Sequence, residues 1–131
     1  MNFNLTQLIL KDMIKSKWGR IINITSDAAK IGNPGQANYV TSKAAIEGMS
    51  RTIANEVASR GITVNCVSPG FVKTDIIESI NKDRLETMIE KIPMKRIGTV
   101  NEISSLVFYL SSEESSYITG QVIHVNGGLT M

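Results

Sequence analysis

The sequence predicts an α/β fold in which helices alternate with the short strands of a parallel sheet. Apolar residues recur at helical spacing in several segments of ten or more residues. Between these segments lie short runs rich in β-branched residues, which suit strands covered on both faces. Glycine and proline clusters separate the two kinds of segment. Because such alternation usually produces right-handed crossovers, we expect the strands to run parallel.

The first predicted helix covers residues 3–17 and ends at Gly19. Its apolar side chains have the spacing of an amphipathic helix and are Leu5, Leu8, Ile9, Met13 and Ile14. The next run, RIINIT at residues 20–25, predicts a strand. A loop is expected over residues 26–36, which contain two glycines, an asparagine and a proline suited to tight turns.

A second helix is predicted from Asn38 to about Arg60, with Gly61 as its stop signal. Its apolar positions are spaced three, four and four residues apart and are Ile46, Met49, Ile53 and Val57. Residues 62–67 predict a second buried strand, closed by a Ser-Pro-Gly turn.

The last third of the chain repeats the alternation. Residues 74–95 are charged and helical in patches, with Pro93 as an interruption, and residues 101–110 predict another helix. A solvated loop containing Glu113 and Glu114 leads to a last strand at residues 121–125. Three strands leave at least one sheet edge without a neighbour, and a bare edge invites a partner.

Composition limits the function classes. The 131 residues are 42% hydrophobic, which suits one domain over residues 1–131. Charged residues make up 20% and the net charge is only +2, so no concentrated basic patch predicts nucleic-acid or membrane binding. No apolar run approaches the roughly 18 residues of a membrane span, and no secretion signal is recognisable. We therefore expect a soluble, cytoplasmic protein.

Two residues that occur once each have structural explanations. Cys66 cannot form an internal disulfide and lies in an apolar strand, so we expect a buried thiol without a reactive role. His124 alternates with Ile123 and Val125, which predicts a packed or edge side chain. One histidine and one cysteine without clustered carboxylates are too few ligands for a metal site.

Tyr39 and Lys43 are the first candidates for chemistry. They lie four residues apart at the start of a predicted helix, so they share one face with Cα atoms about 6 Å apart along the axis. A free phenol is a poor acid at neutral pH, and a neighbouring ammonium group stabilises the phenolate left when its proton is donated. Ser26 directly follows a predicted parallel strand, at the edge where open α/β sheets bind ligands. Its hydroxyl could donate to a substrate carbonyl oxygen.

The surrounding residues make these candidates specific. The motifs, in order, are GRIINITS, then NPGQANYVTSKAAIEG with its tyrosine thirteen residues after the serine, then NCVSPGFVKTD and YITGQVIHVNGG. Together they strongly resemble the short-chain dehydrogenase/reductase family, and most closely its bacterial 3-oxoacyl-acyl-carrier-protein reductases. The resemblance covers essentially the whole chain. It implies the C-terminal portion of a doubly wound, Rossmann-like parallel sheet, with about three strands and flanking helices.

The resemblance also implies catalytic roles. Tyr39 corresponds to the proton donor to the carbonyl oxygen, and Lys43 to the residue that activates it and holds the nicotinamide ribose. Ser26 corresponds to the residue that orients the substrate oxygen and stabilises its developing charge.

Further positions correspond to cofactor contacts in the family. Pro69, Gly70 and Val72 match a loop that packs near the nicotinamide and bonds its carboxamide, and Thr74 matches a hydroxyl near the amide or diphosphate. Without the resemblance, Pro69 and Gly70 would be explained by a plain turn at the end of a strand. The charged segment 75–95, with Met88 and Met94, matches a mobile substrate lid, although a solvated amphipathic helix explains it almost as well.

The implied function is reduction of a 3-oxoacyl thioester on acyl carrier protein by NADPH, in fatty acid biosynthesis and in a homotetramer. The residues of this sequence do not themselves decide the acyl chain length, or NADPH over NADH. One alternative is a truncated, non-catalytic remnant or oligomerisation module. A weaker one is a serine hydrolase using Ser26, His124 and Asp75, but no GxSxG turn surrounds Ser26.

Members of the family are roughly twice as long, and their first half resembles a dinucleotide-binding unit with a glycine-rich turn. No GxGxxG or GxxxGxG run occurs here. The family's catalytic asparagine would fall just before Met1, and neither Asn2 nor Asn4 aligns with it. We therefore expect that the N-terminal half is absent, and that this chain alone is marginally stable, binds cofactor weakly and tends to associate.

Overall fold

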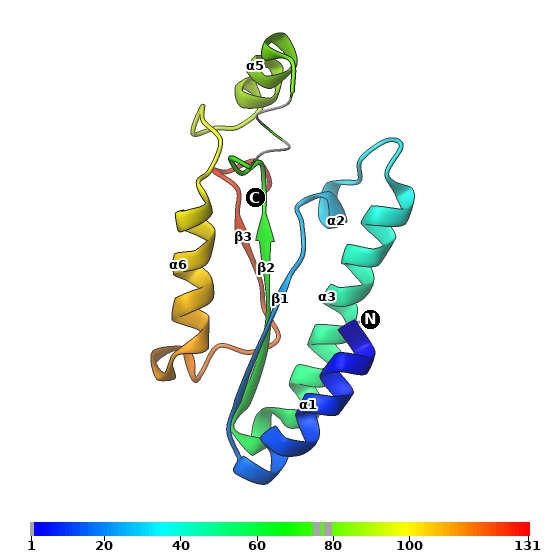
Figure 1. Ribbon diagram of the computed structural model, residues 1–131, viewed down its shortest axis with the longest axis vertical. Helices are drawn as coiled ribbons and strands as arrows, with labels where there is room; N and C mark the ends of the chain where they lie inside the picture. The colour runs from blue at the N-terminus through cyan, green and yellow to red at the C-terminus, as the bar shows by residue number, and fades with distance from the viewer. Residues whose placement is uncertain (1, 75–76, 78–79) are drawn as a thin grey trace.

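The computed structural model describes residues 2–74, 77 and 80–131. Its centre is a three-stranded parallel sheet in the order β1-β2-β3, formed by β1 (Gly19–Ile24), β2 (Ile62–Pro69) and β3 (Val122–Val125). β2 pairs with β1 from Gly19 opposite Ile62 onwards, and with β3 from Cys66 opposite Val122 onwards. The predicted α/β class and parallel sheet are confirmed (Figure 1).

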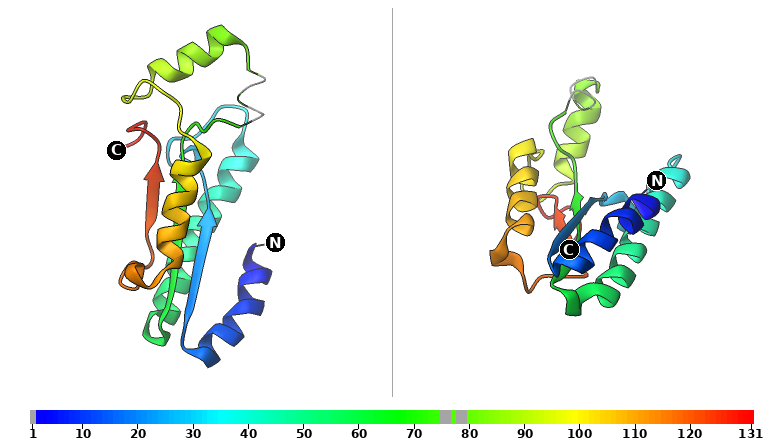
Figure 2. Two further views of the ribbon diagram at one scale, coloured as in Figure 1. Left: turned by 60° about the vertical axis from the view of Figure 1, so that its left-hand side comes forward. Right: turned by 60° about the horizontal axis from the view of Figure 1, so that its bottom comes forward.

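Helices cover both faces of the sheet. α1 (Asn2–Ser16) and α3 (Ala37–Val57) lie on one face, and α6 (Val100–Ser111) lies on the other (Figures 1 and 2). α5 (Lys82–Glu90) stands beyond the carboxyl ends of the strands. Single turns, η1 (Ala58–Arg60) and η2 (Glu113–Ser115), connect the larger elements. Within the described residues, no helix is long and apolar enough to cross a membrane.

The positions of α3 and α6 correct one expectation. β1, β2 and β3 follow one another in one direction across the sheet, so two right-handed crossovers would place both helices on the same face. The helices lie on opposite faces, so the two crossovers have opposite hands (Figure 2). The connection between β2 and β3 first passes over the carboxyl edge through α5, and this long path removes the constraint that a tight strand–helix turn imposes.

The main core lies between the sheet and α3. Its buried residues come from β1, β2 and α3 and are Ile21, Ile53, Ala54, Val57, Ile62 and Val64. Ile9, Leu10 and Met13 of α1 pack against this cluster. Ile9 and Met13 belong to the predicted apolar face, but Leu5 and Leu8 of that face are more than half exposed, and Leu10 was not predicted. The predicted stop at Gly61 is confirmed, because this residue has a φ of 70°, in the left-handed region.

Two local predictions are wrong. The expected loop over residues 26–36 contains a short helix, α2 (Ala28–Ile31), whose turns are closed by hydrogen bonds such as Gly32 N to Ala28 O at 2.9 Å. The second wrong prediction is Gly19 as the stop of the first helix. The helix ends at Ser16, and Lys17 takes the left-handed conformation with a φ of 53°. Gly19 instead opens β1, where a Cβ atom would lie 2.5 Å from the sulfur of Met13.

The start of α6 is held by a capping box. Thr99 Oγ1 accepts from Glu102 N at 3.3 Å, and Thr99 N donates to Glu102 Oε2 at 2.8 Å. Arg96 donates to both carboxylate oxygens of Glu102, at 2.6 and 3.0 Å. The hydrogen bonds from Arg96, and then those from Thr99, lower the pKa of Glu102 to about 2.

We predict that the stability of Glu102→Gln falls less steeply at low pH than the stability of the wild type does. The folded-state pKa of about 2 lies below the ordinary value of 4.5, so the ionised carboxylate stabilises the fold above pH 4.5. That contribution disappears as the pH falls from 4.5 towards 2. The Tm difference between wild type and Glu102→Gln should shrink across this window. A constant difference would contradict the account. Glu86→Gln, in a 4.0 Å pair on α5, is the control.

Leu110 and Phe108 allow a matched test of the packing of α6. Leu110 is fully buried, whereas Phe108 on the same helix is 77% exposed. Leu110→Ala should lower the free energy of unfolding by about 2–5 kcal/mol, and Phe108→Ala by less than about 0.5 kcal/mol. Urea denaturation of the two variants measures the difference. Equal effects would mean that α6 does not pack on the sheet as described.

Candidate active site

The strands end together at one edge of the sheet, and the candidate residues gather there. Ser26 lies just beyond β1, Gly70 follows β2 and Asn126 follows β3. A cleft of about 830 Å³ opens beside this edge, between α2, the start of α3 and α5. Ser26, Tyr39, Pro69 and Gly70 all line it. The structure therefore brings together residues from three segments that are separated in the sequence.

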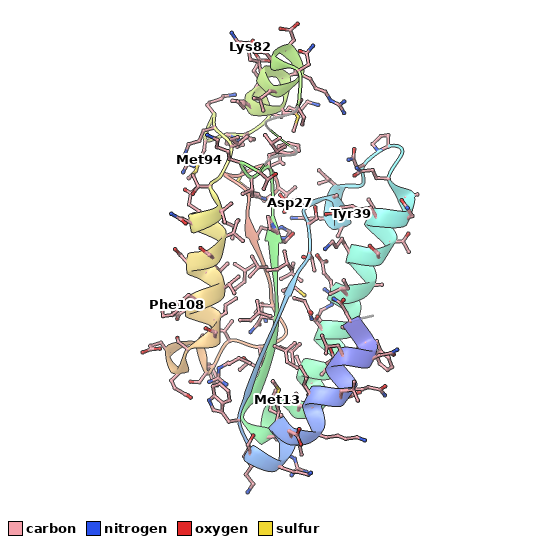
Figure 3. The ribbon with its side chains drawn as sticks, viewed as in Figure 1. Met13, Asp27, Tyr39, Lys82, Met94 and Phe108 are labelled. Carbon is pink, nitrogen blue, oxygen red and sulfur yellow. The ribbon has the colours of Figure 1, made fainter. Side chains whose placement is uncertain are left out.

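Ser26 and Tyr39 supply hydroxyl groups to the same cleft. Ser26 is half-buried, and its Oγ accepts a hydrogen bond from the Ala28 amide at 3.3 Å as α2 begins. Tyr39 lies in the first turn of α3, is 41% exposed and faces the region where β1 ends (Figure 3). A Tyr hydroxyl and a Ser hydroxyl can both donate to one acceptor in such a space.

Lys43 joins α3 to the end of β1. Its Nζ donates to the carbonyl oxygen of Ile24 at 2.9 Å, two residues before Ser26. The same ammonium lies 5.6 Å from the centre of the Tyr39 ring, within the range of a cation–π contact. Lys43 does not line the cleft itself, and its ammonium lies over the face of the tyrosine ring.

The Pro69–Gly70 turn forms part of the cleft wall and is hydrogen-bonded to the segment after β1 and to the end of β3. Pro69 O accepts from the Asp27 amide, and Gly70 N donates to Val125 O, each at 3.1 Å. A Cβ at Gly70 would lie 2.8 Å from the Cβ of Asn126, which explains the glycine by close approach of β3.

Val72 and Thr74 do not line the cleft. Val72 forms a parallel bridge with Gly98, in which Lys73 N donates to Gly98 O and Gly98 N donates to Phe71 O, both at 2.9 Å. Because backbone groups alternate in extended chain, the amide and carbonyl of Val72 itself point away from Gly98. A carboxamide could donate to the Val72 carbonyl and accept from the Val72 amide, because it has both an NH₂ group and a carbonyl oxygen.

The expected lid segment contributes to the cleft only in part. Met88 of α5 lines it together with the basic residues Arg84 and Lys91. Met94 instead lines a separate cavity of about 310 Å³ near α6. Met88 and Met94 therefore line two different cavities.

His124 has a partner that the sequence did not suggest. Its Nδ1 lies 2.6 Å from Oδ1 of Asp27, a buried carboxylate directly after Ser26. The sequence held one signal for this contact: Asp27 directly follows Ser26, and His124 lies in a strand that ends at the same edge of the sheet. Among the described residues, no hydrogen bond joins His124 to Ser26, and Asp75 lies outside them. The hydrolase triad has no support in this geometry.

Cys66 lies at the middle of β2 and is fully buried. Burial raises the pKa of its thiol, which favours the unreactive protonated form. In the part of the chain that the structure describes, no three His, Cys, Asp or Glu residues gather to hold a metal ion.

Comparisons with known proteins identify the family of this chain. A family model described as "Enoyl-(Acyl carrier protein) reductase" matches residues 2–130. The chain belongs to the short-chain dehydrogenase/reductase family. The resemblance stated from the motifs is thereby confirmed.

Several curated proteins are similar to the chain. "Nodulation protein G" of Rhizobium meliloti is 50% identical over 129 residues, which are 98% of this chain and 53% of that protein. "3-oxoacyl-[acyl-carrier-protein] reductase FabG" of Rickettsia felis is 48% identical over 130 residues, which are 99% of this chain and 54% of that protein. The protein of the same name from Staphylococcus epidermidis is 48% identical over 129 residues, 98% of this chain and 53% of its own length. The chain thus spans about half the length of these relatives.

Proposed function

We propose that this cleft reduces the carbonyl group of a 3-oxoacyl thioester with a reduced nicotinamide cofactor. The observation that carries the proposal is the shared cleft of Ser26 and Tyr39, with the Lys43 ammonium over the face of the tyrosine ring. Tyr39 donates its proton to the carbonyl oxygen, while the Ser26 hydroxyl holds that oxygen by a second hydrogen bond. Lys43 stabilises the phenolate that remains.

The substrate class rests on the relatives and on the lining of the cleft. Two of the relatives above are named as reductases of 3-oxoacyl groups on acyl carrier protein. The apolar lining residues suit an acyl chain and are Ile31, Phe71, Ile77, Ile80, Met88 and Leu129. The partner is therefore acyl carrier protein bearing the thioester, and the place of action is fatty acid biosynthesis in the cytoplasm.

The cofactor proposed is NADPH, which supplies hydride when it is bound. The residues present fit its nicotinamide end. Pro69 and Gly70 line the cleft, and the Val72 amide and carbonyl, two residues further on and outside that lining, offer a donor and an acceptor for a carboxamide. Lys43 and Tyr39 supply donors for ribose hydroxyls, with Thr74 as a further hydroxyl for the amide or diphosphate. The choice of NADPH over NADH follows the resemblance alone.

A second candidate is a non-catalytic remnant or oligomerisation module, with a homotetramer as the assembly. Its support is the apolar surface of α1, where Phe3, Leu5 and Leu8 are all more than half exposed. This candidate predicts association without turnover.

Turnover of an acetoacetyl thioester, followed by oxidation of NADPH at millimolar cofactor, distinguishes the two candidates. The wild-type chain should turn over, and Tyr39→Phe should lower kcat by about 100-fold or more because the proton donor is lost. Tyr117→Phe is the matched control, since that fully exposed tyrosine lies outside the cleft. Absence of turnover in the folded wild-type chain would contradict the proposal and favour the second candidate. A Tyr39→Phe variant as active as wild type would remove Tyr39 from its role.

A further inference from the structure

A buried carboxylate lies where the carboxyl ends of all three strands meet. The side chain of Asp27 is only 4% exposed. Its Oδ1 accepts from Ser68 Oγ at 3.2 Å and faces His124 Nδ1 at 2.6 Å, while its Oδ2 accepts from Asn126 Nδ2 at 2.6 Å. These donors come from the end of β2, from β3 and from the residue after β3.

The arrangement satisfies a group that is costly to bury. A carboxylate without partners in a protein interior is strongly unfavourable, whereas one that accepts several hydrogen bonds is tolerated. An ionised carboxylate only accepts, so the His124 tautomer that fits carries its proton on Nδ1. The two shortest contacts, from His124 and Asn126, therefore fix both oxygens of Asp27 at once.

Asp27 and its partner Asn126 also bond to the backbone and side chains around the strand ends. Asp27 N donates to Pro69 O, and the residue before it is Ser26. Asn126, which binds Oδ2, also donates to the Thr130 hydroxyl at 2.8 Å and accepts from Gly128 N at 2.9 Å. The carboxylate thus joins the Ser26 turn, the Pro69–Gly70 turn and the C-terminal turn into one unit.

We propose that Asp27, held by His124 and Asn126, is a positioning residue that sets the orientation of Ser26 and of the Pro69–Gly70 turn. It acts through these groups and not on the substrate itself. This inference rests on the proposed function for its kinetic consequence, but its structural consequence can be measured without turnover. Two other charged groups face the cavity that His124 lines, Arg96 and Glu102, and they are paired with each other at 2.6 Å.

Three variants separate the roles. Asp27→Asn keeps the shape but removes the charge, and its amide NH₂ must face either Asn126 Nδ2, which is a donor, or His124 Nδ1, which accepts only after a change of tautomer. His124→Ala removes one donor, and His124→Asn restores an N–H near the position of Nδ1 without a titratable ring. Asp12→Asn is the matched control, because the Asp12 side chain is 87% exposed on α1. Circular dichroism shows which variants fold.

The kinetic readout is the split between kcat and KM for the thioester. Asp27→Asn and His124→Ala should lower kcat by about 10- to 100-fold with KM changed less than about threefold, because small misplacements of catalytic groups are costly. His124→Asn should recover most of kcat, and Asp12→Asn should match wild type. A folded Asp27→Asn with wild-type kcat overturns the inference. If Asp27→Asn does not fold, the His124→Ala and His124→Asn pair decides: failure of the asparagine to rescue overturns it.

The second readout is NMR of the wild-type chain during a pH titration. The chain has a single histidine, so its ring signals are unambiguous. The amide signals of Ser26 and Gly70 should shift in step with that ring, and this coupling should vanish in His124→Asn. Amides that do not follow the ring overturn the inference. If the wild-type chain shows coupling without turnover, the proposed reductase function fails while the positioning inference stands.

Discussion

Parallel pairing of β2 with both of its neighbours brings the ends of the three strands together beside the cleft. In a parallel sheet the carboxyl ends of the strands meet at one edge, so the residues that follow them become neighbours. Ser26, Gly70 and Asn126 meet in this way, although they are far apart in the chain. A slip of one residue in either pairing would turn the side chains to the opposite face and separate them.

β2 also carries polar side chains that hold this register. Asn65 is buried, donates to Ile118 O at 2.8 Å and accepts from Gln121 N at 3.1 Å, which fixes the entry into β3. Ser68 is buried and donates to Asp27, which fixes the exit from β1. Because buried polar groups are costly without partners, these bonds favour one alignment over its alternatives. The central strand therefore provides both the core and the specificity of its pairing.

The sequence predicts much of this framework because its signals are local. Helical spacing on α1 and α3, the β-branched runs of β1 and β2, and the stop at Gly61 all act within a few residues. Ser26 and Tyr39 were predicted from the resemblance, and the structure places both in one cleft. Features that depend on distant segments were not accessible in the same way. The Asp27–His124 contact joins residues 97 positions apart, and the opposite hand of the second crossover depends on the path through α5.

Cross-strand NOEs from the backbone of Cys66 test the central claim most directly. The account predicts contacts from Cys66 to both Asn23 on β1 and Val122 on β3, its register partners on the two sides. Contacts to only one neighbour, or a contact pattern centred one residue along either strand, would contradict it. The carboxyl ends would then no longer converge on a common cleft.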